Sequence, residues 1–142
     1  MPQVPTNYLA VLGAAIVSMV VGFLWYGPVF GKAWMKEMGW TKEHMEAAKK
    51  KGMGKSYAIM FVGSLLMSFV LHHALFFAST YLSVVGVSAG IMAGFWNWLG
   101  FVAPVTLGSV LWENKSWKLW LLNNGYYVVT LCAMGVTLAL WM

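Results

Sequence analysis

The fold is decided by the stretch from Ser56 to Trp112, which reads SYAIMFVGSLLMSFVLHHALFFASTYLSVVGVSAGIMAGFWNWLGFVAPVTLGSVLW. It contains no Asp, Glu, Lys or Arg. It is also too long for one membrane crossing, because about 20 helical residues already span the hydrocarbon core. We therefore expect two spans, at about 57–77 and 87–111, with a kink at Pro104 in the second. The turn between them is expected to include Ser79, Thr80, Ser83 and Gly86.

Two further uncharged stretches flank this region, at about 8–27 and 119–142. Each is long enough to cross a bilayer and is apolar on all sides, which is not the pattern of a soluble core helix. Asn7 or Thr6 is expected to cap the first stretch. Gly27-Pro28 is expected to end it, because proline cannot continue a helix without losing a backbone hydrogen bond.

Composition supports the same architecture. The chain has 142 residues, of which 61% are hydrophobic and only 9% are charged, against about 25% charged in soluble domains. The sequence predicts an all-α protein, an integral membrane four-helix bundle, with residues 1–142 as a single membrane domain. There is no Arg and there is one cysteine, Cys132. A nucleic-acid partner is not expected, because phosphate recognition favours Arg, and nothing in the sequence indicates a cofactor.

Lysine placement predicts the topology. Seven of the nine lysines lie in the loop of about residues 28–56, and the other two are Lys115 and Lys118. The N-terminal tail, the second loop and the C-terminus carry none. Because basic loops stay in the cytoplasm, we expect both lysine-bearing loops inside and both termini outside.

The first loop is predicted to form a short cytoplasmic surface helix between helices one and two. Thr41 has the character of an N-cap, and Gly52 of a C-cap. The lysines before Gly52 have two interpretations: they bind anionic lipid headgroups, or they act only as a topology signal and as charge that suits the end of a helix. These lysines are Lys49, Lys50 and Lys51.

Two stripes of small residues recur at steps of four, a spacing that lets membrane helices approach closely. One interpretation gives one stripe to the bundle and the other to a homo-oligomer. The alternative gives both to packing within one bundle. The first stripe comprises Ala10, Ala14, Ser18 and Gly22, and the second comprises Gly86, Gly90 and Gly94.

Polar residues inside the predicted spans are candidates for a function, because polar groups are costly in a bilayer. Ser64, Ser68 and His72 share one helical face, whereas His73 lies on another. We expect His72 to face the bundle and to contact Asn97, either as part of a proton relay or ligand site with Ser68, or as a structural hydrogen-bonded pair. A metal site is not expected, because adjacent histidines point about 100° apart on a helix.

A second candidate site lies at the inner boundary, where aromatic residues surround one acidic residue. Such a box could hold a cation. The alternative is an aromatic belt in which Glu113 pairs with Lys115 or Lys118. The members of this group are Trp25, Tyr26, Trp112, Glu113, Asn123, Asn124 and Tyr126.

The segment LWYGPVFGKAW, residues 24–34, resembles the signature of the uncharacterised membrane proteins grouped as domain-of-unknown-function family 1761. The resemblance continues through Asn7-Tyr8, residues 98–101, Trp112-Glu113 and residues 124–126, and so covers nearly the whole chain. It implies a small multi-span protein of a bacterial-type inner membrane, and it implies no activity.

The sequence shows no phosphate-binding loop, paired carboxylates or nucleophile–base spacing, so an enzyme is not the favoured interpretation. We expect a polytopic inner-membrane protein that forms an oligomeric small-solute or ion pathway. One alternative is a structural or partner-binding membrane protein. A second alternative is a membrane enzyme that acts on a lipophilic substrate.

Overall fold

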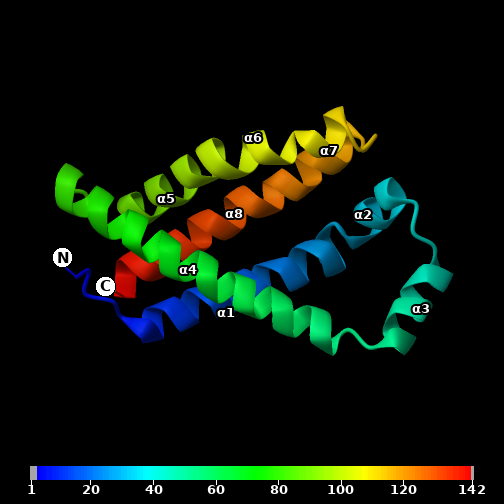
Figure 1. The fold of residues 1–142 in the computed structure, drawn as a ribbon, viewed down its shortest axis with the longest axis horizontal. Helices are drawn as coiled ribbons and strands as arrows, with labels where there is room; N and C mark the ends of the chain where they lie inside the picture. Colours follow the sequence, from blue (N-terminus) through cyan, green and yellow to red (C-terminus); the bar gives the residue numbers. More distant parts are fainter. Residues whose placement is uncertain (1–2, 142) are drawn as a thin grey trace.

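The computed structural model describes residues 3–141, which are helical almost throughout (Figure 1). Met142, the last residue of the fourth predicted span, lies outside the described residues. The helical elements are α1 (Tyr8–Leu24), the π-helical turn η1 (Trp25–Val29), α2 (Gly31–Met38), α3 (Lys42–Lys51), α4 (Gly54–Leu82), α5 (Gly86–Asn97), the π-helical turn η2 (Trp98–Val102), α6 (Ala103–Thr106), α7 (Gly108–Leu111) and α8 (Trp117–Trp141).

The four expected spans are present. Among the described residues, four helical segments are long and apolar enough to cross a membrane: Tyr8–Val29, Gly54–Leu82, Gly86–Leu111 and Trp117–Trp141. The chain is therefore a multi-pass membrane protein.

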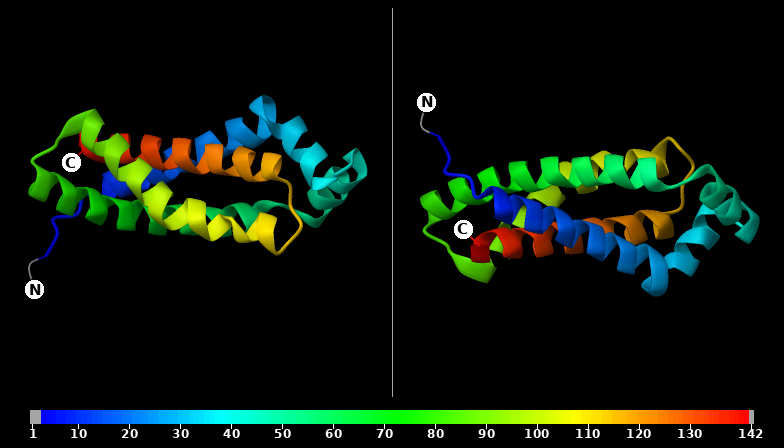
Figure 2. Two further views of the ribbon diagram at one scale, coloured as in Figure 1. Left: turned by 90° about the horizontal axis from the view of Figure 1, so that it is seen from above. Right: turned by 90° about the horizontal axis from the view of Figure 1, so that it is seen from below.

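The α8 helix lies between α5 and α1, and α4 packs against α1. Figures 1 and 2 show both chain ends at one end of the bundle, here called the terminal end. The α2 and α3 helices and the connection at residues 112–116 lie at the opposite end. We call this the lysine end, because these segments and the adjoining first turns of α4 and α8 together carry all nine lysines.

The first span begins as predicted and ends later than predicted. The Asn7 side chain caps it by accepting from the N–H groups of Leu9 and Ala10. Gly27-Pro28 does not stop the helix. Pro28 has no N–H, and the chain widens into a π turn in which the N–H of Phe30 donates to the Trp25 carbonyl at 2.8 Å. The wider turn carries the helix past the proline.

The second span is longer at both ends than the predicted 57–77, so the connection that follows is short. Ser79, expected in the turn, stays helical, and its hydroxyl donates to the Phe76 carbonyl at 3.1 Å. The turn is made by residues 83–85 alone, where Ser83 adopts a left-handed conformation with φ 56°.

The third span is interrupted rather than simply kinked. The π turn η2 precedes Pro104, and a second interruption at Leu107 separates α6 from α7. Both π turns begin with tryptophan and carry glycine two residues later, at Gly27 and Gly100.

Both stripes of small residues pack within the chain. A Cβ added at Gly90 would lie 2.5 Å from backbone atoms of Gly135, so α5 and α8 are in backbone contact there. On α1, Ala14 and Ser18 are buried, and a Cβ added at Gly22 would lie 3.1 Å from the Tyr126 hydroxyl. The interpretation that gave both stripes to one bundle is therefore the one that the packing supports.

The predicted helix of the first loop is present as α3. The Thr41 hydroxyl caps it at the N–H of His44, and the His44 ring accepts from the Thr41 N–H, completing a capping box. Gly52 ends it with φ 83°. The α2 helix, which precedes α3, was not expected from the sequence.

Candidate functional site: a polar pocket beside the interrupted span

Thr106 lies at the centre of a hydrogen-bonded cluster on the interrupted span. Its hydroxyl donates to the Val102 carbonyl at 2.8 Å. The same oxygen accepts from the indole N–H of Trp120 at 3.1 Å and from the amide of Asn124 at 3.0 Å. Pro104 has no N–H, so the helical ladder lacks one backbone hydrogen bond in this segment. Through its bonds to Trp120 and Asn124, the Thr106 hydroxyl ties the segment to α8.

Asn124 completes the connection. It is 2% exposed, and its carbonyl oxygen accepts from the indole N–H of Trp98 at 3.0 Å. Its amide also donates to the Trp120 carbonyl, one turn earlier on α8. A buried side chain amide with both ends bonded fixes the register of two helices, because any slip would leave polar atoms unpaired in an apolar medium.

A pocket of about 290 Å³ opens beside this cluster, between α6–α7 and α8. Glu113, which follows α7 at the lysine end, lies at its rim and is exposed. Non-helical backbone at membrane depth is tolerated where it is buried or lines a polar cavity, and π turns frequently occur at functional sites. The pocket lining comprises Val105, Thr106, Gly108, Ser109, Glu113, Trp120, Asn123, Asn124 and Tyr127.

Asn123 connects the pocket to the first span. The Tyr26 hydroxyl donates to its side-chain oxygen at 2.7 Å. That bond leaves the amide N–H groups of Asn123 without a protein partner within residues 3–141. The pocket therefore offers a carboxylate acceptor from Glu113 and an amide donor from Asn123. Trp120 and Tyr127 add aromatic rings to the lining.

Only part of the predicted inner-boundary group meets here. Glu113, Asn123 and Asn124 line one pocket, and Tyr26 reaches it through Asn123. The ring of Tyr126 lies 5.0 Å from that of Tyr26 and outside the pocket lining.

The tryptophans expected in the aromatic box lie elsewhere. The indole of Trp25 donates to the Leu122 carbonyl, and Trp112 is 84% exposed. The aromatic residues of the pocket are instead Trp120 and Tyr127, which were not among the residues predicted for the site. One sequence signal was available for Trp120, which lies four residues before Asn124 and so shares its helical face.

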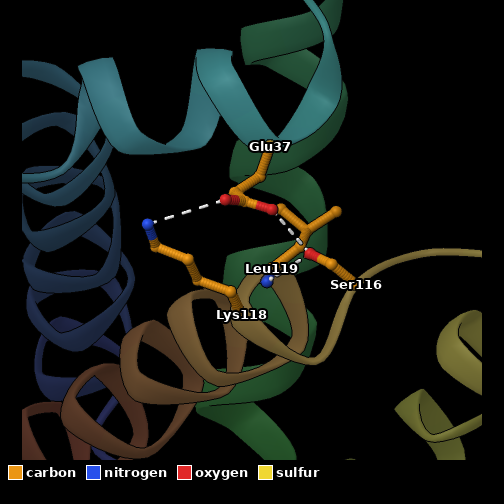
Figure 3. Close-up of polar contacts among 4 residues, drawn as sticks. All are labelled: Glu37, Ser116, Lys118 and Leu119. Carbon is orange, nitrogen blue, oxygen red and sulfur yellow. Dashed lines mark hydrogen bonds and ion pairs between the residues drawn. The ribbon is translucent and has the colours of Figure 1, made fainter.

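Glu113 is also not paired as the alternative interpretation expected. The Lys118 ammonium lies 3.6 Å from Glu37 on α2, and the Ser116 hydroxyl donates to the same carboxylate at 2.7 Å (Figure 3). Ser116 also caps α8 by accepting from the Leu119 N–H. These contacts tie α2 to the start of α8. Within the described part of the chain, the Glu113 carboxylate has no ion-pair partner.

The predicted intramembrane site of His72, Ser68 and Asn97 is only half assembled. His72 is 1% exposed and Ser68 is fully buried, so this face of α4 is turned inward as expected. His72 donates from Nε2 to the Pro5 carbonyl at 3.1 Å, and Ser68 donates to the Val11 carbonyl at 2.8 Å.

The expected contact between His72 and Asn97 is wrong. Asn97 donates to the Ala93 carbonyl of its own helix. It lines a small hollow of about 140 Å³ between α4 and α5, whose lining on α4 includes Ala74 and Ala78. His72 instead lies on the α4 face that meets α1. On α4, position 72 lies on a different face from positions 74 and 78, which border the hollow with Asn97. That difference in helical face separates His72 from Asn97. Across residues 3–141, no cluster of three or more potential metal ligands is present.

A family profile described as "Protein of unknown function (DUF1761)" matches residues 9–139. The chain belongs to this family. The resemblance seen in residues 24–34 is thereby confirmed. The DUF1761 match includes every residue of the pocket. No curated protein and no solved structure matches the chain. The description of the DUF1761 family names no activity.

Proposed function

We propose that this DUF1761 protein forms a pathway for a small cation, and that the pocket beside the interrupted span is its binding site. The observation that carries the proposal is the position of the Glu113 carboxylate, which has no ion-pair partner among residues 3–141, at the rim of a cavity lined by the interrupted span. In membrane transport proteins, interrupted helices supply binding sites because their polar groups are exposed to a cavity.

The lining favours a cation with some apolar character. Glu113 supplies the opposite charge, and the rings of Trp120 and Tyr127 offer faces that attract cations. Asn123 has an amide free to orient a polar group on the ligand. A volume of about 290 Å³ suits a small ligand such as an alkylammonium ion.

The proposed pathway opens toward the lysine end and is closed toward the terminal end. There, Leu75, Met134 and Leu138 are buried, and α5 touches α8 at Gly90. The lysine asymmetry supports a cytoplasmic location for the lysine end. On this proposal the pocket faces the cytoplasm from a bacterial-type inner membrane. A homo-oligomer remains part of the proposal, because four helices enclose little interior.

The test is binding of tetramethylammonium to the purified protein by isothermal titration calorimetry. Glu113→Gln should weaken binding about fivefold, because an exposed charge pair contributes at most about 1 kcal/mol. The matched control is Glu43→Gln on α3, which removes the same charge away from the pocket and should leave the affinity unchanged. Equal affinity for all three proteins would overturn the proposed site.

Flux through proteoliposomes then tests the pathway. The protein should carry tetramethylammonium down a concentration gradient, and Glu113→Gln should reduce the rate. Binding that depends on Glu113 without flux would reject transport and leave a ligand-binding or partner-binding role.

A further inference from the structure

An apolar groove of about 960 Å³ runs between α1 and α4 on the outer surface of the bundle. On α1 its wall includes Ile16 and Phe23, which are 49% and 73% exposed. On α4 its wall includes Met60 and Phe61, and Tyr126 of α8 contributes to the base. The groove is separate from the solute pocket, although Tyr127 borders both.

The length of the groove matches one leaflet. Its wall on the first span runs from Ile16 in α1 to Gly27 in η1. At 1.5 Å per residue this distance is about 17 Å, close to half of the roughly 30 Å hydrocarbon core. The wall ends at the lysine end of the span. An extended acyl chain of the leaflet at that end would therefore fit along the groove.

The sequence is basic near the end of the groove marked by Gly27 and Tyr57, here called its mouth. Lys32 follows Gly27 by five residues, and Lys55 precedes Tyr57, the first α4 residue of the lining, by two; both lysines are exposed. Residues 30–56 carry seven lysines and three glutamates, a net charge of +4. Tyr57, 52% exposed, lines the mouth, where tyrosine favours the headgroup level. Apolar walls below a basic mouth complement an anionic phospholipid.

We propose that the groove between α1 and α4 binds one anionic phospholipid of the lysine-end leaflet, with an acyl chain in the groove and its phosphate beside Lys32 and Lys55. This assignment differs from general attraction to the lysine run 49–51, because it requires the groove and two particular lysines. It stands independently of the proposed solute pathway.

Native mass spectrometry of the purified protein tests the proposal, with phosphatidylglycerol and phosphatidylcholine added in equal amounts. The protein should retain phosphatidylglycerol in preference. Lys32→Gln with Lys55→Gln should weaken that retention on the order of tenfold. The matched control is Lys49→Gln with Lys50→Gln, which removes the same charge from α3. It should change the retention of phosphatidylglycerol little.

A second pair of variants tests the acyl chain. Ala58→Phe fills the groove from α4 and should reduce retention of phosphatidylglycerol. Val70→Phe adds an aromatic ring to an exposed α4 position outside the groove lining and should not. Equal retention of the two lipids by the unaltered protein would overturn the proposal. So would a loss of phosphatidylglycerol in the Lys49 and Lys50 variant as large as that in the Lys32 and Lys55 variant. A dimer that Ala58→Phe disrupts, with no bound lipid, would assign the groove to a second copy instead.

Discussion

Gly90→Ala should destabilise the bundle. The added Cβ would lie 2.5 Å from backbone atoms of Gly135, whereas ordinary contact begins at 3.4 Å, so α5 and α8 must separate by 0.9 Å locally. A gap of 0.5–1 Å forfeits about a quarter to a half of each dispersion contact, and dispersion is a main force between membrane helices. Overpacking of this kind costs about 1–3 kcal/mol. Alanine returns about 0.5–1 kcal/mol through helix propensity, so the net loss lies between about 0 and 2.5 kcal/mol, with about 1 kcal/mol expected.

Unfolding of the purified protein in mixed micelles, titrated with a denaturing detergent and followed by circular dichroism, measures this loss. Gly63→Ala is the matched control, because it lies inside α4 and a Cβ there meets nothing within 4 Å. It should be neutral or slightly stabilising. Gly90→Leu, with a much larger side chain, should prevent folding. If Gly90→Ala and Gly63→Ala change the free energy of unfolding equally, the backbone contact does not hold the helices together.

Two further predictions concern topology and the histidines. Cysteines introduced at Glu46 and Leu82, in a background without the native cysteine, should label from inside and outside the cell respectively; labelling of position 46 from outside would overturn the lysine-based topology. His72→Phe should lower the free energy of unfolding by about 0.6 kcal/mol more than His73→Phe does, the average contribution of a polar pair in a membrane. The reason is that His72 is buried and donates to the Pro5 carbonyl outside its helix, whereas His73 bonds to a carbonyl of its own helix. Equal losses would mean that the buried bond contributes nothing.

The spans could be predicted because their determinants are local. The uncharged stretch from Ser56 to Trp112 requires two crossings whatever their arrangement, and Asn7 caps the helix that directly follows it. The π turns could not be predicted, because hydropathy does not distinguish a four-residue hydrogen-bond ladder from a five-residue one. Sequence therefore located the four spans and the proline that disturbs the third, but not the π turns.

The pocket was only partly predictable because it depends on register between helices far apart in sequence. Asn124 was a candidate from its cost in a membrane, but its partners Thr106 and Trp98 are set by how α8 meets the interrupted span. The contact predicted between His72 and Asn97 was wrong for the same reason. The depth of a residue in the membrane can be counted along its helix, whereas the neighbour that each helix face meets depends on how the helices pack.

The contact between Gly90 and Gly135 also restricts which substitutions this protein can accept during evolution. When two side chains collide, shortening one can rescue enlargement of the other. Here a new Cβ on α5 would collide with main-chain atoms of α8, which every amino acid carries. No substitution at Gly135 can make room, so the usual route of compensating mutation is closed. A suppressor of Gly90→Ala must shift a whole helix, and such suppressors should be rare and should lie outside the contact itself.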